Sequence, residues 1–126
     1  MTEVEKELIE LTQHLLDSIA SGDWEAYQRL CDPTLTAFEP EARGHLVSGM
    51  AFHQFYFDLA EERSTPVHTT MSAPHVRMLG NQAAMLYVIL YFQPNILKNQ
   101  QVNQLQYNYC ACCIMNMCQM NFSKKT

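Results

Sequence analysis

The chain has 126 residues, of which 48% are hydrophobic and 17% are charged, and its formal net charge is −5. This length fits one domain with its own core and excludes a kinase, a dinucleotide-binding enzyme or a multidomain machine within the chain. The longest apolar run, residues 83–92, is about half as long as a membrane span. Because no signal-peptide pattern opens the sequence, we predict a cytoplasmic protein with no membrane partner.

The charge is divided unevenly along the chain. Residues 1–62 hold all thirteen carboxylates and three basic residues, a net charge of −10, whereas residues 63–126 hold five basic residues and no carboxylate. This split has two interpretations: subunits that attract one another head to tail, or a solvated acidic helix followed by a sparsely charged sheet. Since the whole chain is acidic and lacks a basic stripe with interleaved aromatic residues, we predict no nucleic-acid partner.

Two helices are predicted near the N-terminus. Apolar residues recur at helical spacing from Val4 to Ile19, Thr2 and Glu5 form a capping box, and Gly22 supplies a left-handed stop. A shorter helix is predicted over residues 24–30, after an aspartate that caps it.

The next segment predicts one short strand and a third helix. Thr34–Phe38 is rich in β-prone residues and is followed by Glu39 and a proline, which end the strand. Apolar residues from Leu46 to Leu59 then predict a helix that ends near residue 62, with Phe55 on its core face.

Antiparallel strands are predicted further along. Val67–Met71 and His75–Leu79 are β-prone, and a Gly-Asn turn leads into Ala83–Phe92, which is apolar on both faces, as expected of a central strand. Helices followed by such strands predict an α+β domain with its helices packed on one face of the sheet.

The C-terminal segment carries weaker patterns. We interpret residues 1–126 as a single domain in which residues 94–126 form a divergent tail, with incomplete final strands. Gln104–Tyr109 and Ala111–Met117 are its candidate strands.

Cysteine usage favours a reducing compartment, because the number of cysteines is odd. Cys31 stands alone, and the other four lie between Cys110 and Cys118. That cluster lacks zinc-site spacing, so we predict no metal site and no cofactor, and we interpret these residues as small buried hydrophobes or part of an irregular tail.

Candidate chemistry rests on a few carboxylates and histidines. Glu39 and Glu41 flank a proline and are either an acid–base pair or plain solvated carboxylates. His53 lies among aromatic residues and is either a ligand-binding imidazole with a shifted pKa or a packed structural histidine. His68 and His75 have no third ligand at zinc spacing. No nucleophile, phosphate-loop or metalloprotease motif occurs, so these spacings predict no more than a soluble α+β domain.

Two long segments are more specific than these spacings. They read GDWEAYQRLCDPTLTAFEPEARGHLVSGMAFHQFYF at residues 22–57 and TPVHTTMSAPHVRMLG at residues 65–80. Both resemble the association, or hub, domain of calcium/calmodulin-dependent protein kinase II, and the resemblance spans residues 4–88.

The resemblance implies a nuclear transport factor 2-like cone, with three N-terminal helices packed on a curved antiparallel sheet. It implies a non-catalytic hub, with no catalytic residue and no enzyme activity in this chain, that associates with itself and with related hub domains. Family hubs are homo-oligomers of two stacked rings, usually of twelve or fourteen subunits, which gather kinase subunits for trans-autophosphorylation. The alternative is a small-ligand-binding protein or enzyme of the wider nuclear transport factor 2-like superfamily.

The resemblance also implies a ligand pocket, onto which only His53 carries over. The family's pocket arginines, which accept small carboxylates, have no counterpart in the central strand or from Gln93 onward. We therefore expect small carboxylates to bind weakly or not at all.

Overall fold

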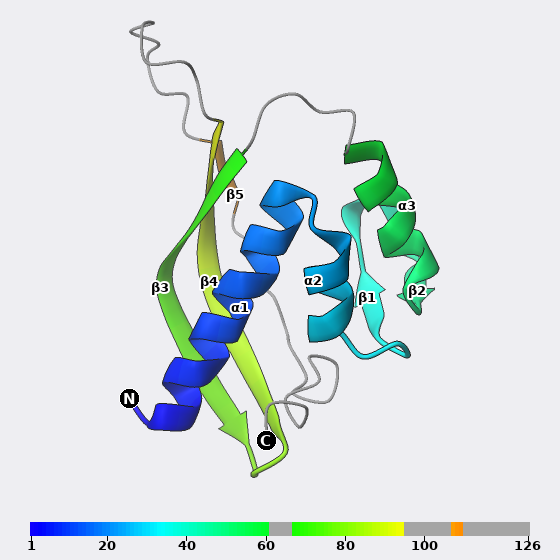
Figure 1. Cartoon of the computed structure of the whole chain (residues 1–126). Helices are drawn as coiled ribbons and strands as arrows, with labels where there is room; N and C mark the ends of the chain where they lie inside the picture. Colours follow the sequence, from blue (N-terminus) through cyan, green and yellow to red (C-terminus); the bar gives the residue numbers. More distant parts are fainter. Residues whose placement is uncertain (61–66, 95–106, 110–126) are drawn as a thin grey trace, which may run out of the picture.

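A computed structural model describes residues 1–60, 67–94 and 107–109 of the chain. Its elements are α1 (Glu3–Ser21), α2 (Trp24–Leu30), β1 (Thr36–Phe38), the short 3-10 helix η1 (Pro40–Ala42), β2 (Leu46–Ser48), α3 (Ala51–Ala60), β3 (Val67–Leu79), β4 (Ala83–Pro94) and β5 (Tyr107–Tyr109). Helices with antiparallel strands make the α+β domain that the sequence predicts (Figure 1).

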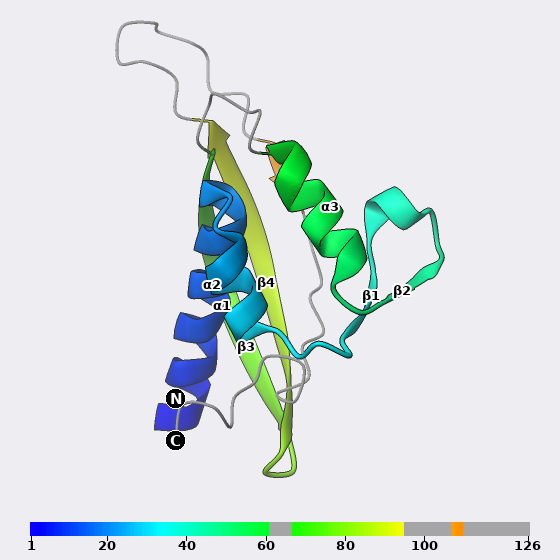
Figure 2. The same cartoon turned by 45° about the vertical axis from the view of Figure 1, so that its right-hand side comes forward.

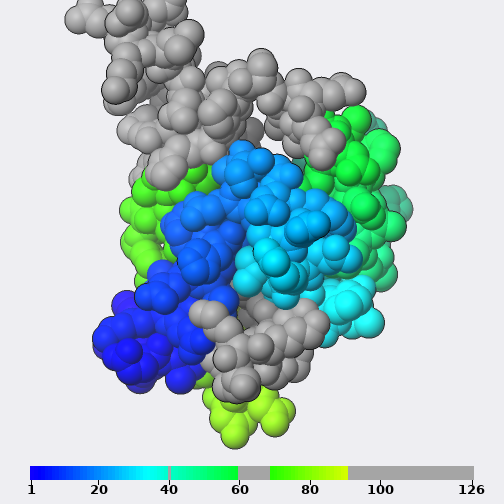
Figure 3. Space-filling model, in the orientation of Figure 1, coloured from blue at the N-terminus to red at the C-terminus, as the bar shows by residue number. Residues whose placement is uncertain are grey.

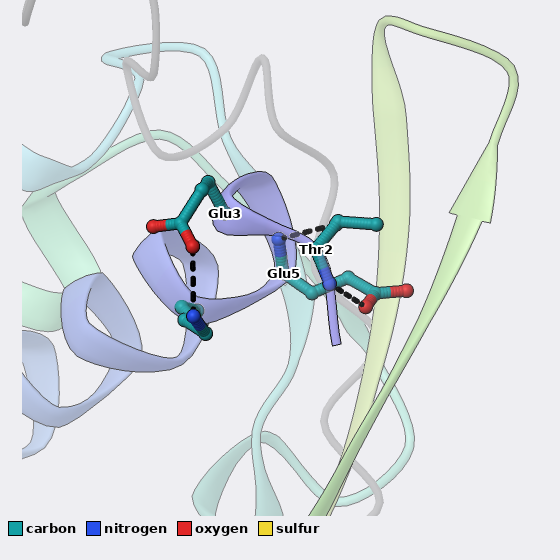
Figure 4. Close-up of polar contacts among 4 residues, drawn as sticks. Thr2, Glu3 and Glu5 are labelled. Carbon is teal, nitrogen blue, oxygen red and sulfur yellow. Dashed lines mark hydrogen bonds and ion pairs between the residues drawn. The ribbon is translucent and has the colours of Figure 1, made fainter.

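Both ends of α1 are fixed by local interactions. The hydroxyl of Thr2 accepts a hydrogen bond from the Glu5 amide at 3.2 Å, and the Thr2 amide donates to the Glu5 carboxylate at 2.8 Å (Figure 4). Gly22 has a φ of 70° and its amide bonds to the carbonyls of Ser18 and Ile19. The predicted capping box and left-handed stop are therefore confirmed.

Helix α1 packs on two sides at once. Leu11 and Leu15 join a core cluster with residues of α2 and α3, whereas Ile9 and Leu16 pack on the buried face of β4. Figures 1 and 2 show α1 along one face of the β3–β4 pair, and Figure 3 shows α1 and α2 covering the centre of that side. Within the described residues, no helix combines the length and apolar character that crossing a membrane requires.

The larger sheet has the strand order β3-β4-β5. Strand β3 pairs with β4 along its whole length, but the register shifts between Ser72 and His75, where Ala73 has a φ of 49°. The two short strands predicted for this region are therefore one strand of 13 residues with a β-bulge. Pro74 has no amide hydrogen to donate, and the bulge accommodates it without ending the strand.

The smaller sheet corrects the prediction for the third helix. Leu46–Ser48 is a strand paired with β1, with Phe38 opposite Leu46, and the helix begins only at Ala51. Gly49 separates the two elements with a φ of 79°, a left-handed conformation that a helix does not continue through. Val47 is buried between exposed neighbours, which is the alternation of a strand.

The predicted core face of α3 is also wrong. Phe55, predicted to lie in the core, is 57% exposed, and Leu59 is 47% exposed. His53 and Phe57, which lie four residues apart on one side of this helix, are buried.

Part of the C-terminal segment joins the larger sheet. The candidate strand over residues 104–109 is confirmed for three residues, because β5 pairs with Leu90–Phe92 of β4. The second candidate strand and the cluster of four cysteines lie outside the described residues.

Candidate functional site

The predicted pocket residue His53 is buried where α3 faces α2. Its side chain is 7% exposed, and its Nδ1 atom lies 3.1 Å from the hydroxyl of Tyr27. The imidazole ring lies 5.8 Å from the Tyr27 ring and 5.9 Å from the Phe52 ring, measured between centroids. Two aromatic rings therefore lie beside this imidazole, of which Phe52 is a predicted neighbour and Tyr27 comes from another helix.

Helix α2 holds Tyr27 in position. Asp23 caps this helix by accepting a hydrogen bond from the Ala26 amide at 3.0 Å. The Tyr27 ring is buried and packs 4.8 Å from Phe57, between ring centroids, so the ring belongs to the core. Its hydroxyl points to His53, which is the usual arrangement of a buried tyrosine with an apolar body and a polar tip.

One of the two predicted carboxylates reaches this cluster. Glu39 directly follows β1, and its Oε1 atom lies 3.8 Å from Nδ1 of His53, with 34% of its side chain exposed. Glu41 lies in the 3-10 helix and is exposed. Of the two predicted carboxylates, Glu39 is thus the one for which the structure shows a contact with the imidazole.

Cys31 completes the cluster at the end of α2. Burial raises the pKa of its thiol to about 11, and a hydrogen bond with Tyr27 opposes this shift only in part. The thiol is therefore protonated at neutral pH and is a poor nucleophile or metal ligand. Tyr27 and Cys31 were not predicted as site residues. Their spacing of four residues, which places two side chains on one helix face, was the available sequence indication.

The imidazole of His53 has one polar atom without a partner. Burial lowers the pKa of His53, and the nearby Glu39 carboxylate opposes the shift but does not cancel it. Its Nε2 atom is buried and has no hydrogen-bond partner within the described part of the chain. Leaving such an atom unsatisfied typically costs about 1–3 kcal/mol. The imidazole is thus neutral near pH 7, and its buried Nε2 is left unsatisfied by the residues that the structure describes.

The arrangement combines a neutral imidazole, a protonated thiol, a phenol and one carboxylate. No group of three or more potential metal ligands occurs among the described residues, and His75 is exposed on β3.

The shifted pKa predicts a pH dependence of stability. Because burial lowers the pKa of His53 below its usual value near 6.5, the unfolded chain takes up a proton at that position more readily than the folded chain. We expect this contribution to be fully present above pH 6.5 and lost progressively as the pH falls below it. Thermal melting between pH 7.5 and pH 5.5 measures the effect. His53→Gln should flatten this profile, whereas His45→Gln, at an exposed position, should not. Parallel profiles for wild type and His53→Gln would contradict the assignment.

Comparisons with known proteins agree on one family. A family model described as "Calcium/calmodulin dependent protein kinase II association domain" matches residues 4–110. The solved hub homology domain of Chlamydamonas reinhardtii calcium/calmodulin-dependent protein kinase II is 39% identical, with a TM-score of 0.69, over 84% of this chain and 79% of that chain. The C. elegans association domain is 45% identical, with a TM-score of 0.65, over 71% and 67% of the two chains. The S. rosetta hub is 40% identical, with a TM-score of 0.60, over 70% and 66%. The match to the family model extends past residue 94 and includes β5.

Proposed function

The chain belongs to the calcium/calmodulin-dependent protein kinase II association domain family, and from this membership we propose that it is an oligomerisation module that associates with copies of itself. The observation that carries the proposal is the match over residues 4–110, which includes all three helices but for the first residue of α1. Its α+β fold, with three helices and antiparallel sheets, is the nuclear transport factor 2-like fold of its hub neighbours.

In detail, we propose that the module forms stacked rings of twelve or fourteen subunits in the cytoplasm. Such rings would gather kinase subunits, and related hub domains would join them. Tethering replaces a dilute encounter with an effective concentration up to the millimolar range, which favours phosphorylation of one subunit by its neighbour. The chain itself is proposed to be non-catalytic, because the buried cluster offers a neutral imidazole and a protonated thiol rather than an activated nucleophile.

We also propose that residues 1–126 act as one association domain. On this proposal, residues 94–126 are a divergent tail that supplies β5 to the sheet and only incompletely replaces the final strands of the family.

Light scattering coupled to size exclusion tests the proposed function. We expect an assembly of roughly twelve to fourteen times the 14.5 kDa chain mass. His53→Ala should leave this mass unchanged, since the imidazole is buried inside one subunit. A monomer or dimer would contradict the proposal and favour the alternative.

That alternative is a small-ligand-binding protein or enzyme of the nuclear transport factor 2-like superfamily. The observation in its favour is the buried Nε2 of His53, which has no partner among the described residues. We propose His53 as the ligand-facing residue of this site, with Tyr27 and Glu39 beside it.

We expect the site to bind small carboxylates poorly. An anion that leaves water needs a cation or several donors to replace its hydration, and Tyr87–Leu90 of the central strand contains no arginine. The negative charge of Glu39 near His53 adds repulsion. Calorimetric titration with a short hydroxy-carboxylate should give a dissociation constant of about 1 mM or weaker. Micromolar affinity would show that another residue supplies the missing positive charge.

A further inference from the structure

Helix α3 is attached to the rest of the described chain through one side. Of residues 51–59, whose side chains the structure describes, His53 and Phe57 are buried, and both contact α2. The Phe57 ring packs on Trp24 and Tyr27, and the imidazole bonds to the Tyr27 hydroxyl. Figure 1 shows α3 at the edge of the molecule, beyond α2, whereas α1 packs on two sides. Elements with few buried contacts open most easily, so we expect α3 to open before α1.

The residue before α3 that favours such a motion is Gly49. It has a φ of 79°, and its amide donates a hydrogen bond to the Leu35 carbonyl at 2.8 Å. Leu35 is buried in the same core cluster as Tyr27, so this end of the segment is anchored. Glycine adopts other backbone conformations at little steric cost. The geometry therefore allows α3 to rotate away from α2 about residue 49 while β1 and β2 stay paired.

The imidazole at this contact has hydrogen-bonding groups near one of its nitrogens. The Tyr27 hydroxyl lies 3.1 Å from Nδ1 of His53, and Oε1 of Glu39 lies 3.8 Å from the same atom. Nε2 is buried and has no partner among the residues that the structure describes. A protonated imidazole carries a hydrogen on both nitrogens, so the closed contact would bury a charged ring with one N–H unsatisfied. Opening of α3 brings that N–H into water, and the open form therefore binds the proton more tightly.

The other ionisable groups around His53 do not reverse this preference. From α2, Tyr27 and Cys31 face it as a neutral phenol and a protonated thiol, and α1 contributes apolar side chains to the same core. On α3 itself Asp58 is exposed. Glu39 is the nearby carboxylate, and its side chain is 34% exposed, so water screens its attraction. In agreement with this balance, burial lowers the pKa of His53 and Glu39 opposes the shift only in part.

We propose that α3 is an acid-released helix: uptake of a proton by His53 frees α3 from α2, while α1 and the larger sheet stay folded. At neutral pH the imidazole is uncharged and α3 is closed. Because the open form binds the proton more tightly, the opening constant of α3 is lowest above pH 6.5 and rises as the pH falls below it. All the groups involved lie within one subunit, so the inference does not rest on the proposed function.

Native-state hydrogen exchange of the full chain locates the opening. After correction for intrinsic exchange rates, the opening constant of amides 54–59 should exceed that of amides 8–15 in α1 at least about 10-fold. Between pH 7.5 and pH 5.5 the α3 constant should rise at least about 3-fold, as expected when opening is linked to one proton. His53→Gln should abolish this rise, whereas His45→Gln, at an exposed position, should preserve it.

Two carboxylates that lie two residues apart provide a matched pair of variants. Glu39→Gln removes the charge that stabilises the protonated ring in the closed form, so the rise with acid should be larger than in wild type. Glu41→Gln, at an exposed position, should behave as wild type, and this pair decides the matter if His53→Gln does not fold. Equal opening constants for α3 and α1 would overturn the proposal, as would a wild-type α3 constant that does not rise with acid. A rise that persists in folded His53→Gln, or one in Glu39→Gln no larger than in Glu41→Gln, would also overturn it.

Discussion

Truncating Phe57 to alanine is expected to lower the free energy of unfolding by about 3–5 kcal/mol. The Phe57 side chain is 7% exposed, and its ring lies 4.8 Å from Tyr27 and 5.2 Å from Trp24, between centroids. Its removal leaves a cavity between α2 and α3. It also removes a packing contact of Tyr27, whose hydroxyl forms the hydrogen bond with His53. Urea denaturation at a fixed protein concentration measures the loss, because association contributes to the apparent stability.

Phe55→Ala provides the matched control. The same substitution two residues away removes a ring that is 57% exposed on the opposite side of α3, and we expect a cost below about 1 kcal/mol. Equal losses for the two variants would show that the faces of α3 are assigned wrongly.

The faces of α3 also show where sequence reasoning failed. The run from Phe52 to Phe57 is aromatic on all sides, so its periodicity does not select the face that will be buried. Treating residues from Leu46 to Leu59 as one helix gave an apolar series that included Phe55, and Phe55 was therefore predicted to lie in the core. The actual start at Ala51 depends on the pairing of β2 with β1, a contact that no local propensity encodes.

Local signals gave reliable predictions elsewhere. The capping box at Thr2 and the left-handed stop at Gly22 act within one turn of helix, and both are present as predicted. The gap between the two strands predicted at Val67–Met71 and His75–Leu79 was placed correctly but interpreted wrongly, since β3 continues through it with a β-bulge.

The site was predictable in part. His53 was predicted from its aromatic neighbours and from a family resemblance, and the structure places it in a buried cluster. Tyr27, Cys31 and Glu39 come to that cluster from α2 and the end of β1, so their meeting depends on tertiary packing. Contacts of this kind cannot be predicted from the local pattern of a single sequence.

Deleting the tail should have the second large effect. Truncation after Gln93 removes β5, which pairs with residues 90–92 of β4. Ala83–Phe92 is apolar and contains no charged residue and no proline, so an unpaired edge there is a template for pairing with other chains. We expect the truncated chain to give heterogeneous high-mass species in light scattering rather than one defined peak.

A second truncation, after residue 110, keeps β5 and ends where the family match ends. If β5 is the part of the tail that protects the edge of β4, this chain should stay in one defined species, whereas the chain that ends at Gln93 should not. The relevant difference between the two truncated chains is the backbone pairing of β5 with β4. Each paired residue satisfies hydrogen-bond donors and acceptors of β4 that would otherwise bond to another chain. One sharp, ring-sized peak from the shorter chain would contradict this argument, since β5 would then contribute nothing to covering the edge.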